Sequence, residues 1–435
     1  MKSLLKKIII FILQYEAKLA LKKYKPRTVL IAGSVGKTTT KDAVFSVLSA
    51  KYFVRKSEKS FNSEIGLPLA ILGLQNAWNN PFLWFTNIIE GLIVTLLKNT
   101  YPHWLVLEVG VDRPGDMERV VSWLPADMVI LTRLPDVPVH VEFFPSPEAV
   151  AEEKAKIIET LKPGGTLILN GDDENVLQAA EQYPEVKTIE YGMGKKNDVI
   201  GMKYGIASKQ KVPQGIRFAV RHTDQAGEDK TENFELHGVL GRQHLYPVLA
   251  GVSAGIAEGM ELPLIKAGLA NYVPPRGRMN ILPGVKKTTI IDDSYNSSPV
   301  AVEEALRLLE QVQVGGRKIA VLGDMMELGK FSIEEHKRIG GLVKGAADML
   351  VTVGFRARHI AEGALNMGMH GSKVFQYEDV DQAGEELEPM LQEGDLILAK
   401  ASQSIRLEKL VADIMAEPER QEELLVRQDR EWRER

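Results

Sequence analysis

A glycine-rich segment close to the N-terminus constrains the fold of this chain more than any other feature. It has the sequence Gly33-Ser34-Val35-Gly36-Lys37-Thr38-Thr39-Thr40, follows an apolar strand pattern at 29–32 and precedes a helical pattern at 39–50. A strand, a glycine-rich turn and a helix in this order form a phosphate-binding loop, because the glycines let backbone N–H groups face phosphate oxygens and the helix N-terminus adds positive potential. The segment therefore predicts an ATP site in which Lys37 reaches the β- and γ-phosphates and the Thr38 hydroxyl binds Mg²⁺.

Strand and helix patterns alternate along the rest of the chain. Helices are predicted at 81–97 and 148–161, and the alternation starts again after Pro274-Pro275. The predicted strands lie at 29–32, 104–108, 128–132, 166–170, 288–292, 318–322, 350–353 and 396–399. This alternation implies mostly parallel sheets covered by helices on both faces. We therefore predict an α/β protein with a P-loop NTPase-like central domain over 28–273 and a Rossmann-like C-terminal domain over 274–415.

The two ends of the chain are charged. Residues 1–27 surround the apolar run 8–13 with Lys2, Lys6, Lys7, Lys18, Lys22, Lys23, Lys25 and Arg27, against Glu16 alone. This run is too short to span a bilayer, so the pattern predicts a basic amphipathic helix that either lies on a membrane surface or packs on the body of the protein. Segment 81–97 predicts a buried or membrane-facing helix, segment 203–235 an irregular hairpin excursion, and the charged tail 416–435 a solvated or frayed helix.

The composition excludes several classes of protein. The chain has no cysteine, which excludes disulfides and thiolate metal sites and fits a reducing cytoplasm. A net charge of −4 gives no overall attraction to nucleic acid. We expect a cytoplasmic monomer without a nucleic-acid partner. The membrane-surface alternative for residues 1–27 would place it at the inner face of the membrane.

Further motifs follow the phosphate loop in a specific order. They are Phe61-Asn62-Ser63-Glu64-Ile65-Gly66-Leu67-Pro68, Leu107-Glu108-Val109-Gly110, His140-Val141-Glu142, Lys154, Asn170-Gly171-Asp172-Asp173, Gly277-Arg278-Met279, Asp292-Asp293-Ser294-Tyr295-Asn296, Leu322-Gly323-Asp324-Met325-Met326-Glu327-Leu328-Gly329 and Lys400-Ala401-Ser402. Together with a Gly-x-x-Gly-Lys-Thr loop that lacks an earlier glycine, this order resembles the Mur ligase family over roughly residues 28–412. Within that family it is most similar to the branch that adds D-alanyl-D-alanine.

The resemblance implies an ATP-dependent ligase of peptidoglycan biosynthesis. Such an enzyme transfers the γ-phosphoryl group of ATP to a carboxylate, and an amine then attacks the acyl phosphate while ADP and phosphate are released. Because phosphoryl transfer depends mostly on positioning and charge neutralisation, cations must lie where the anionic reactants meet. The implied substrates are D-alanyl-D-alanine and an acceptor peptide of the muropeptide type.

The same resemblance assigns roles to single residues. The implied catalytic residues are Lys37, Glu108, His140 and Lys154. One Mg²⁺ would be held by Thr38 and Glu108, and a second by Glu108, His140 and a carbamylated Lys154. The implied ATP contacts are Gly33, Ser34, Val35, Gly36, Lys37, Thr38, Thr39, His244, Arg278 and Asp293. The implied substrate contacts are Asn62, Asp324, Glu327, Lys400 and Ser402. For Asp324, Glu327 and His336, helix capping or turn formation is an equally good interpretation.

Two departures from the family pattern leave the acceptor open. Gly241-Arg242-Gln243-His244 stands where the family has Gly-x-His-Asn, and the phosphate loop begins near residue 33, which leaves no room before it for a UDP-sugar-binding domain. The alternatives are therefore a D-alanyl-D-alanine-adding ligase, a ligase acting on a membrane-linked or poly-glutamate acceptor, and a P-loop ATPase switch acting through protein partners. Arg278 and Lys400 in a second α/β domain argue against the switch.

Overall fold

The computed structural model describes residues 3–58, 64–77, 80–138, 140–209, 212–224, 226–429 and 432, with side chains from residue 7 onward. The strands are β1 (Arg27–Ala32), β2 (Val54–Lys56), β3 (Trp104–Glu108), β4 (Ala126–Leu131), β5 (Leu161–Asn170), β6 (Lys187–Gly192), β7 (Val199–Lys209), β8 (Val212–Thr223), β9 (Asp229–His237), β10 (Asn280–Gly284), β11 (Thr288–Asp293), β12 (Lys318–Gly323), β13 (Met349–Val353), β14 (Val374–Tyr377) and β15 (Leu396–Lys400).

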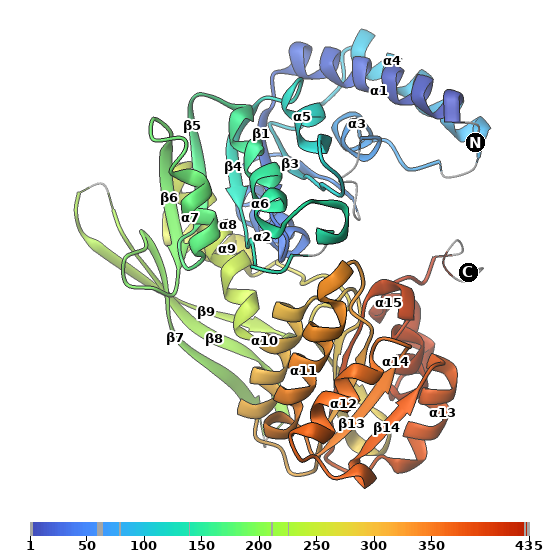
Figure 1. Cartoon of the computed structure of the whole chain (residues 1–435). Helices are drawn as coiled ribbons and strands as arrows, with labels where there is room; N and C mark the ends of the chain where they lie inside the picture. The colour runs from blue at the N-terminus through green and yellow to red at the C-terminus, as the bar shows by residue number, and fades with distance from the viewer. Residues whose placement is uncertain are drawn as a thin grey trace.

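Helices connect these strands and cover both sheets (Figure 1). They are α1 (Ser3–Tyr24), α2 (Lys37–Ser49), α3 (Gly66–Leu72), α4 (Pro81–Leu96), α5 (Asp116–Val121), α6 (Pro147–Ala155), α7 (Glu174–Ala180), α8 (Leu245–Ala257), α9 (Leu262–Leu269), α10 (Pro299–Gln311), α11 (Ser332–Ala346), α12 (Arg358–Asn366), α13 (Val380–Met390), α14 (Glu408–Ile414) and α15 (Gln421–Leu424). Short 3₁₀ helices lie at Val141–Phe143, Lys156–Thr160, Arg242–His244, Val285–Lys287, Gly329–Phe331, Gly371–Lys373, Gln403–Ile405 and Pro418–Arg420.

The first sheet contains the phosphate-binding segment. Its strand order is β2-β3-β1-β4-β5-β6-β7-β8-β9, parallel from β2 to β7 and antiparallel from β7 to β9. In the register of β1 and β3, Ile31 pairs with Glu108. Because β1 and β3 are parallel, the loop after β1 starts at the same sheet edge at which Glu108 ends β3, the usual place for ligands in such sheets.

Alternate residues of β1 face two different helical layers. Val29 and Ile31 pack in the core that contains α2 and α8, whereas Leu30 and Ala32 pack in the core that contains α1 and α3. A strand buried on both faces has an almost continuous apolar sequence, which is why 29–32 could be predicted as a strand.

The second sheet has the order β10-β11-β15-β12-β13-β14, with β10 antiparallel to β11 and the other pairs parallel. Apolar residues of α10, α11 and α12 pack on one face of this sheet, and those of α13 and α14 pack on the other. Two mostly parallel sheets with helices on both faces confirm the predicted α/β class.

Three local predictions are corrected by the structure. Segment 203–235 does form hairpins, as predicted, but it is not irregular, because β7, β8 and β9 form a long antiparallel meander through it. The predicted helix over 148–161 ends at Ala155 and is followed by a 3₁₀ helix, since β5 already begins at Leu161. The tail is not frayed over 418–429: Leu425 is fully buried, and the Arg427 guanidinium donates to Glu408 Oε2 at 2.6 Å and to the Ser294 carbonyl at 2.6 Å.

The basic N-terminal helix packs on the body of the protein. Leu13, Ala17 and Ala20 on α1 are fully buried in the core on one face of the first sheet. Its opposite side remains exposed at Ile8, Phe11 and Tyr15. In the part of the chain that the structure describes, no helix is both long enough and apolar enough to cross a bilayer.

Candidate active site

The phosphate loop has the backbone geometry that its glycines allow. Gly33 has φ 138° and Gly36 has φ 87°, a region that side-chain-bearing residues rarely adopt. A Cβ atom on Gly33 would also lie 2.0 Å from Thr132 Oγ1, so the loop passes too close to the end of β4 for any larger residue. The loop leads into α2, and Lys37 Nζ donates to the Gly33 carbonyl at 3.0 Å.

Beside this loop, a hydroxyl and a carboxylate form a pair suited to Mg²⁺. Thr38 Oγ1 donates to Glu108 Oε2 at 2.8 Å, and Lys41 Nζ lies 3.9 Å from the same oxygen. Glu108 is 2% exposed, and its backbone N–H donates to Ser57 Oγ at 3.3 Å. Mg²⁺ prefers oxygen ligands of this kind, so the donor set fits the ion that the sequence implied.

Lys154 is buried against the phosphate loop and is not a surface lysine. It is 2% exposed, and its Nζ donates to Ser34 Oγ at 2.8 Å. Burial, together with the nearby Lys37 ammonium, lowers the pKa of Lys154 to about 7. A substantial fraction of this amine is therefore neutral at neutral pH, and the neutral amine is the form that can add CO₂ to become a carbamate.

His140 lies between the two domains. Its Nε2 is 3.6 Å from Asp112 Oδ1, and its Nδ1 is 3.0 Å from Glu327 Oε2. His140 and Glu327 both have positive φ, 70° and 63°, so the contact joins two backbone turns in an uncommon conformation. In the described ranges, no three His, Cys, Asp or Glu side chains are grouped to hold a metal.

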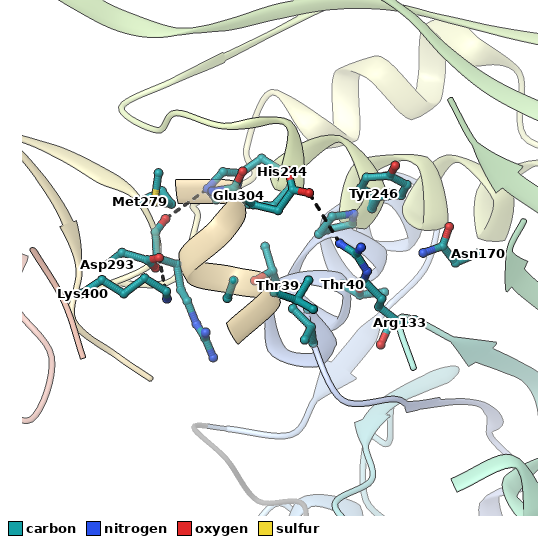
Figure 2. A pocket seen from close by; sticks show the side chains of 18 of the residues that line it. Thr39, Thr40, Arg133, Asn170, His244, Tyr246, Met279, Asp293, Glu304 and Lys400 are labelled. Atoms are coloured by element: carbon teal, nitrogen blue, oxygen red, sulfur yellow. Dashed lines mark hydrogen bonds and ion pairs between the residues drawn. The ribbon is translucent and has the colours of Figure 1, made fainter. Parts of the chain in front are cut away.

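The C-terminal domain contributes cations and a carboxylate to a cavity between the domains (Figure 2). Asp293 at the end of β11 lies 2.7 Å from Lys400 Nζ at the end of β15, and Lys400 is 1% exposed. The Arg278 guanidinium lies 4.3 Å from the centre of the Tyr295 ring. Val35, Gly36 and Thr39 line the same cavity from the other domain, so the structure brings both halves of the predicted ATP site together.

His244 also lines this cavity and is fixed in its neutral form. Its Nε2 donates to the Arg278 carbonyl at 3.1 Å, and burial lowers its pKa to about 4. Because Nε2 carries the proton, Nδ1 is an acceptor, and it has no hydrogen-bond partner among the described residues. His244 can therefore accept a hydrogen bond from a ligand in the cavity.

The predicted substrate residues have different surroundings. Asp324 Oδ1 accepts from the backbone N–H of Ala357 at 2.8 Å, and Ser402 Oγ accepts from Met326 N–H at 3.0 Å, so both side chains hold loops in place. His336 is completely buried, with Nε2 accepting from Met325 N–H, an arrangement that fits the turn interpretation. Asn62 lies outside the described residues.

Sequence reasoning missed several residues that line the cavity or its edge. Arg133, just after β4, lies 3.8 Å from Glu304 on α10 and thereby connects the two domains. Tyr246 and Asn170 line the cavity (Figure 2). The Tyr246 hydroxyl donates to Asp172 at 3.2 Å. Arg133 directly follows a predicted strand, and this position at the carboxyl edge of a parallel sheet could have identified it. Asn170 belongs to the sequence motif at 170–173, which by itself assigns it no role in the site.

Comparison with known proteins shows the family and fold to which this chain belongs. Two family models match, the Mur ligase middle domain over residues 87–255 and the Mur ligase glutamate ligase domain over residues 277–403. The UDP-N-acetylmuramoyl-tripeptide–D-alanyl-D-alanine ligase of Bacillus subtilis (strain 168) is 30% identical over 407 residues, covering 93% of this chain and 79% of that protein. The ligase of the same name from Synechocystis is 26% identical over 388 residues, covering 89% and 74%.

Solved structures share the fold. MurF from Acinetobacter baumannii matches with a TM-score of 0.75 at 22% identity, covering 92% of this chain and 79% of that one. The MurF ligase from Thermotoga maritima in complex with ADP matches with a TM-score of 0.73 at 23% identity, covering 92% and 82%. The chain belongs to the Mur ligase family. It is accordingly an ATP-dependent ligase that forms an amide bond.

Proposed function

We propose that this chain joins D-alanyl-D-alanine to the terminal carboxylate of a peptidoglycan precursor peptide. The observation that carries the proposal is a cavity divided between two domains, lined by Val35, Gly36 and Thr39 on one side and by Arg278, Asp293 and Lys400 on the other. Lys37 and the Thr38–Glu108 pair belong to the same phosphate-loop region as the first group. The names of the relatives from Bacillus subtilis and Synechocystis support the choice of substrates.

The residues divide the work of the reaction. The Lys37 ammonium neutralises charge on the β- and γ-phosphates as the γ-phosphoryl group moves to the acceptor carboxylate. Arg278 approaches the phosphates from the other domain, and Asp293 binds the ribose. The amine of the dipeptide then attacks the acyl carbon, the C–N bond forms, and phosphate leaves with the acyl-phosphate oxygen. Because the groups come from two domains, closure of the domains gates the reaction.

Mg²⁺ would lower the charge repulsion between the phosphates and the acceptor carboxylate. We propose two ions. Thr38 and Glu108 would hold the first, and Glu108, His140 and Lys154 as a carbamate would hold the second. The buried position of Lys154, its pKa near 7 and its contact with Ser34 support this assignment.

A second candidate changes only the acceptor. An acceptor carried on a membrane lipid is favoured by the exposed apolar side chains of α1 and α4, including Phe11, Phe82 and Phe85. In this version the protein is a cytoplasmic monomer that works at the inner face of the membrane through residues 1–27. A UDP-linked acceptor needs no such contact.

The test is mass spectrometry of the products formed from ATP, D-alanyl-D-alanine and a panel of acceptors, some linked to UDP and some to a lipid. We expect the acceptor to gain one dipeptide while ADP and phosphate appear in equal amounts. Release of AMP and pyrophosphate would overturn the acyl-phosphate mechanism. ATP hydrolysis that needs neither carboxylate nor amine would support a P-loop ATPase switch instead.

A further inference from the structure

Helix α4 has its large apolar side chains on the outside, whereas an ordinary surface helix has them facing the core. Its buried positions are Trp84, Asn87, Gly91 and Thr95, so most of its inward side is small or polar. Its large apolar residues point outward, at Phe82, Leu83, Phe85, Ile89, Leu92, Ile93 and Leu96, with exposed fractions from 41% to 75%. Contiguous apolar surface of this kind marks a contact with a membrane or a partner. With 16 residues, α4 is shorter than the ~20 needed to span a bilayer.

Helix α1 carries a second exposed stripe, which changes character along its length. Ile8, Phe11, Tyr15, Lys18 and Lys22 are all exposed and recur at alternating intervals of three and four residues, and the exposed Lys25 directly follows the helix. Residues with this spacing lie on one face of a helix. The stripe is therefore apolar over its first half and basic over its second half. The one acidic residue of α1, Glu16, lies on the opposite side and is 2% exposed.

The two helices form one unit. They lie side by side at the end of the molecule farthest from the second sheet (Figure 1). Tyr24 donates from its hydroxyl to the Val94 carbonyl at 2.9 Å, and Lys23 Nζ donates to the same carbonyl at 3.1 Å. These bonds join the C-terminal ends of α1 and α4, so the two helices are held together as one unit. The apolar outer side of α4 and the stripe of α1 are together called the α1–α4 face.

Positive charge is concentrated beside the α1–α4 face. Lys18, Lys22 and Lys25 line a hollow together with Lys162 and Trp123, and the Lys18 ammonium lies 5.9 Å from the centre of the Trp123 ring. Asp127 pairs with Lys162 at 2.7 Å, and Glu90 is the exposed carboxylate of α4. Apolar side chains flanked by lysines and tryptophan are typical of surfaces that bind the headgroup region of an anionic bilayer.

We propose that the α1–α4 face docks this protein peripherally on an anionic phospholipid bilayer. The outward side chains of α4 and the first half of the α1 stripe enter the headgroup boundary, while the lysines meet lipid phosphates. Charge complementarity selects this occupant, because a second copy of the chain would bring one lysine cluster against another in a symmetric contact. Docking at this end leaves the C-terminal domain on the side away from the bilayer and free to close on the nucleotide.

The test is flotation of the full chain with vesicles of equal parts phosphatidylglycerol and phosphatidylcholine, compared with phosphatidylcholine alone. The apolar variant is Phe82→Ser/Phe85→Ser/Leu92→Ser, and the basic variant is Lys18→Gln/Lys22→Gln/Lys25→Gln. Matched controls change three exposed residues elsewhere, Leu264→Ser/Val273→Ser/Met367→Ser and Lys195→Gln/Lys196→Gln/Lys287→Gln. Thermal unfolding of each variant checks that it is folded. Flotation needs neither ATP nor acceptor, so it stands or fails apart from the proposed reaction.

We expect the unchanged chain and both controls to float with the anionic vesicles, and less so as salt rises. The apolar variant should bind about tenfold more weakly or worse. The basic variant should lose roughly a hundredfold at low salt, because each lysine near an anionic surface contributes to binding. The proposal would be overturned if the unchanged chain did not float, or if the folded apolar and basic variants floated as well as the unchanged chain. A dimer of the unchanged chain in solution that the apolar variant converts to a monomer would also overturn it.

Discussion

Helices α2 and α4 are tied to opposite faces of the first sheet and bury polar side chains for different reasons. On α2, the buried Lys41 lies 3.9 Å from Glu108, and the buried Asp42 accepts from Lys56 at 2.6 Å. On α4, the buried Asn87 and Thr95 donate to main-chain carbonyls, at 2.8 Å and 2.9 Å. Buried polar residues therefore mark a reaction site where charged groups from other elements face them. Where the buried polar side chains contact only backbone carbonyls, as on α4, any functional surface of the helix is expected on its outer side.

The largest expected effect is on the α2 side. Lys37→Ala should lower turnover roughly a thousandfold, because a cation that neutralises charge in the transition state is removed. The measurement is release of ADP and phosphate with formation of ligated product. Lys51→Ala, at an exposed position just after the end of the same helix, is the matched control and should retain activity. Comparable activity of the two variants would mean that α2 does not take part in the reaction, and the contrast between α2 and α4 would then fail.

Lys154 should give the next largest effect. Lys154→Ala should lower turnover by about a hundredfold, because the proposed carbamate would no longer supply oxygen to the second Mg²⁺. Added formate or acetate should restore part of the activity by occupying the vacated space. The control is Lys156→Ala, whose lysine is partly exposed and pairs with Glu153 at 2.8 Å. Full activity of Lys154→Ala without added acid would contradict the assignment.

Lys154 also shows where prediction from the sequence ends. The phosphate loop and the strand at 104–108 could be predicted because both patterns are local. The neighbours Glu152, Glu153 and Lys156 suggested a solvated helix, yet Lys154 itself contacts Ser34, 120 residues earlier in the chain. Pairs that join distant elements, such as Arg133 with Glu304 and Arg427 with Glu408, leave no trace in periodicity. They depend on how the layers pack, which one sequence does not specify.

A smaller effect is expected between α1 and α4. Both carboxylate oxygens of Glu16 lack a hydrogen-bond partner among the described residues, and a Cβ added to Gly91 would lie 2.0 Å from Oε2. Burial raises the pKa of Glu16 from 4.5 to about 7. The native state therefore holds this proton more tightly than the unfolded chain does, so stability falls as pH rises from about 4.5 to about 7 and then levels off.

Glu16→Gln should remove the loss of stability that the unchanged chain shows as pH rises. Its free energy of unfolding should exceed that of the unchanged chain by up to about 3 kcal/mol at pH 8, and the two should converge near pH 4.5. Urea unfolding across this pH range gives the difference directly. A gain that does not depend on pH would mean that the carboxylate already finds a partner in the folded chain.

The smallest expected effect is a difference in stability between variants of the two buried polar residues of α4. Asn87 Nδ2 donates to the Gln75 carbonyl, which lies in a different segment, so Asn87→Ala leaves that acceptor without its donor and should cost about 1–2 kcal/mol. Thr95 Oγ1 donates to Leu92 within its own helix, and a hydroxyl bond of this kind adds little to a helix. Thr95→Val keeps the shape of the side chain and should change stability by less than about 0.5 kcal/mol. Urea unfolding of both variants measures the difference.

Equal losses would mean that the inward side of α4 depends on both hydroxyl and amide, as the inward side of α2 depends on its charges. Unequal losses in the expected order would show that Asn87 anchors α4 to the body, while Thr95 is tolerated because the apolar residues of this helix face outward.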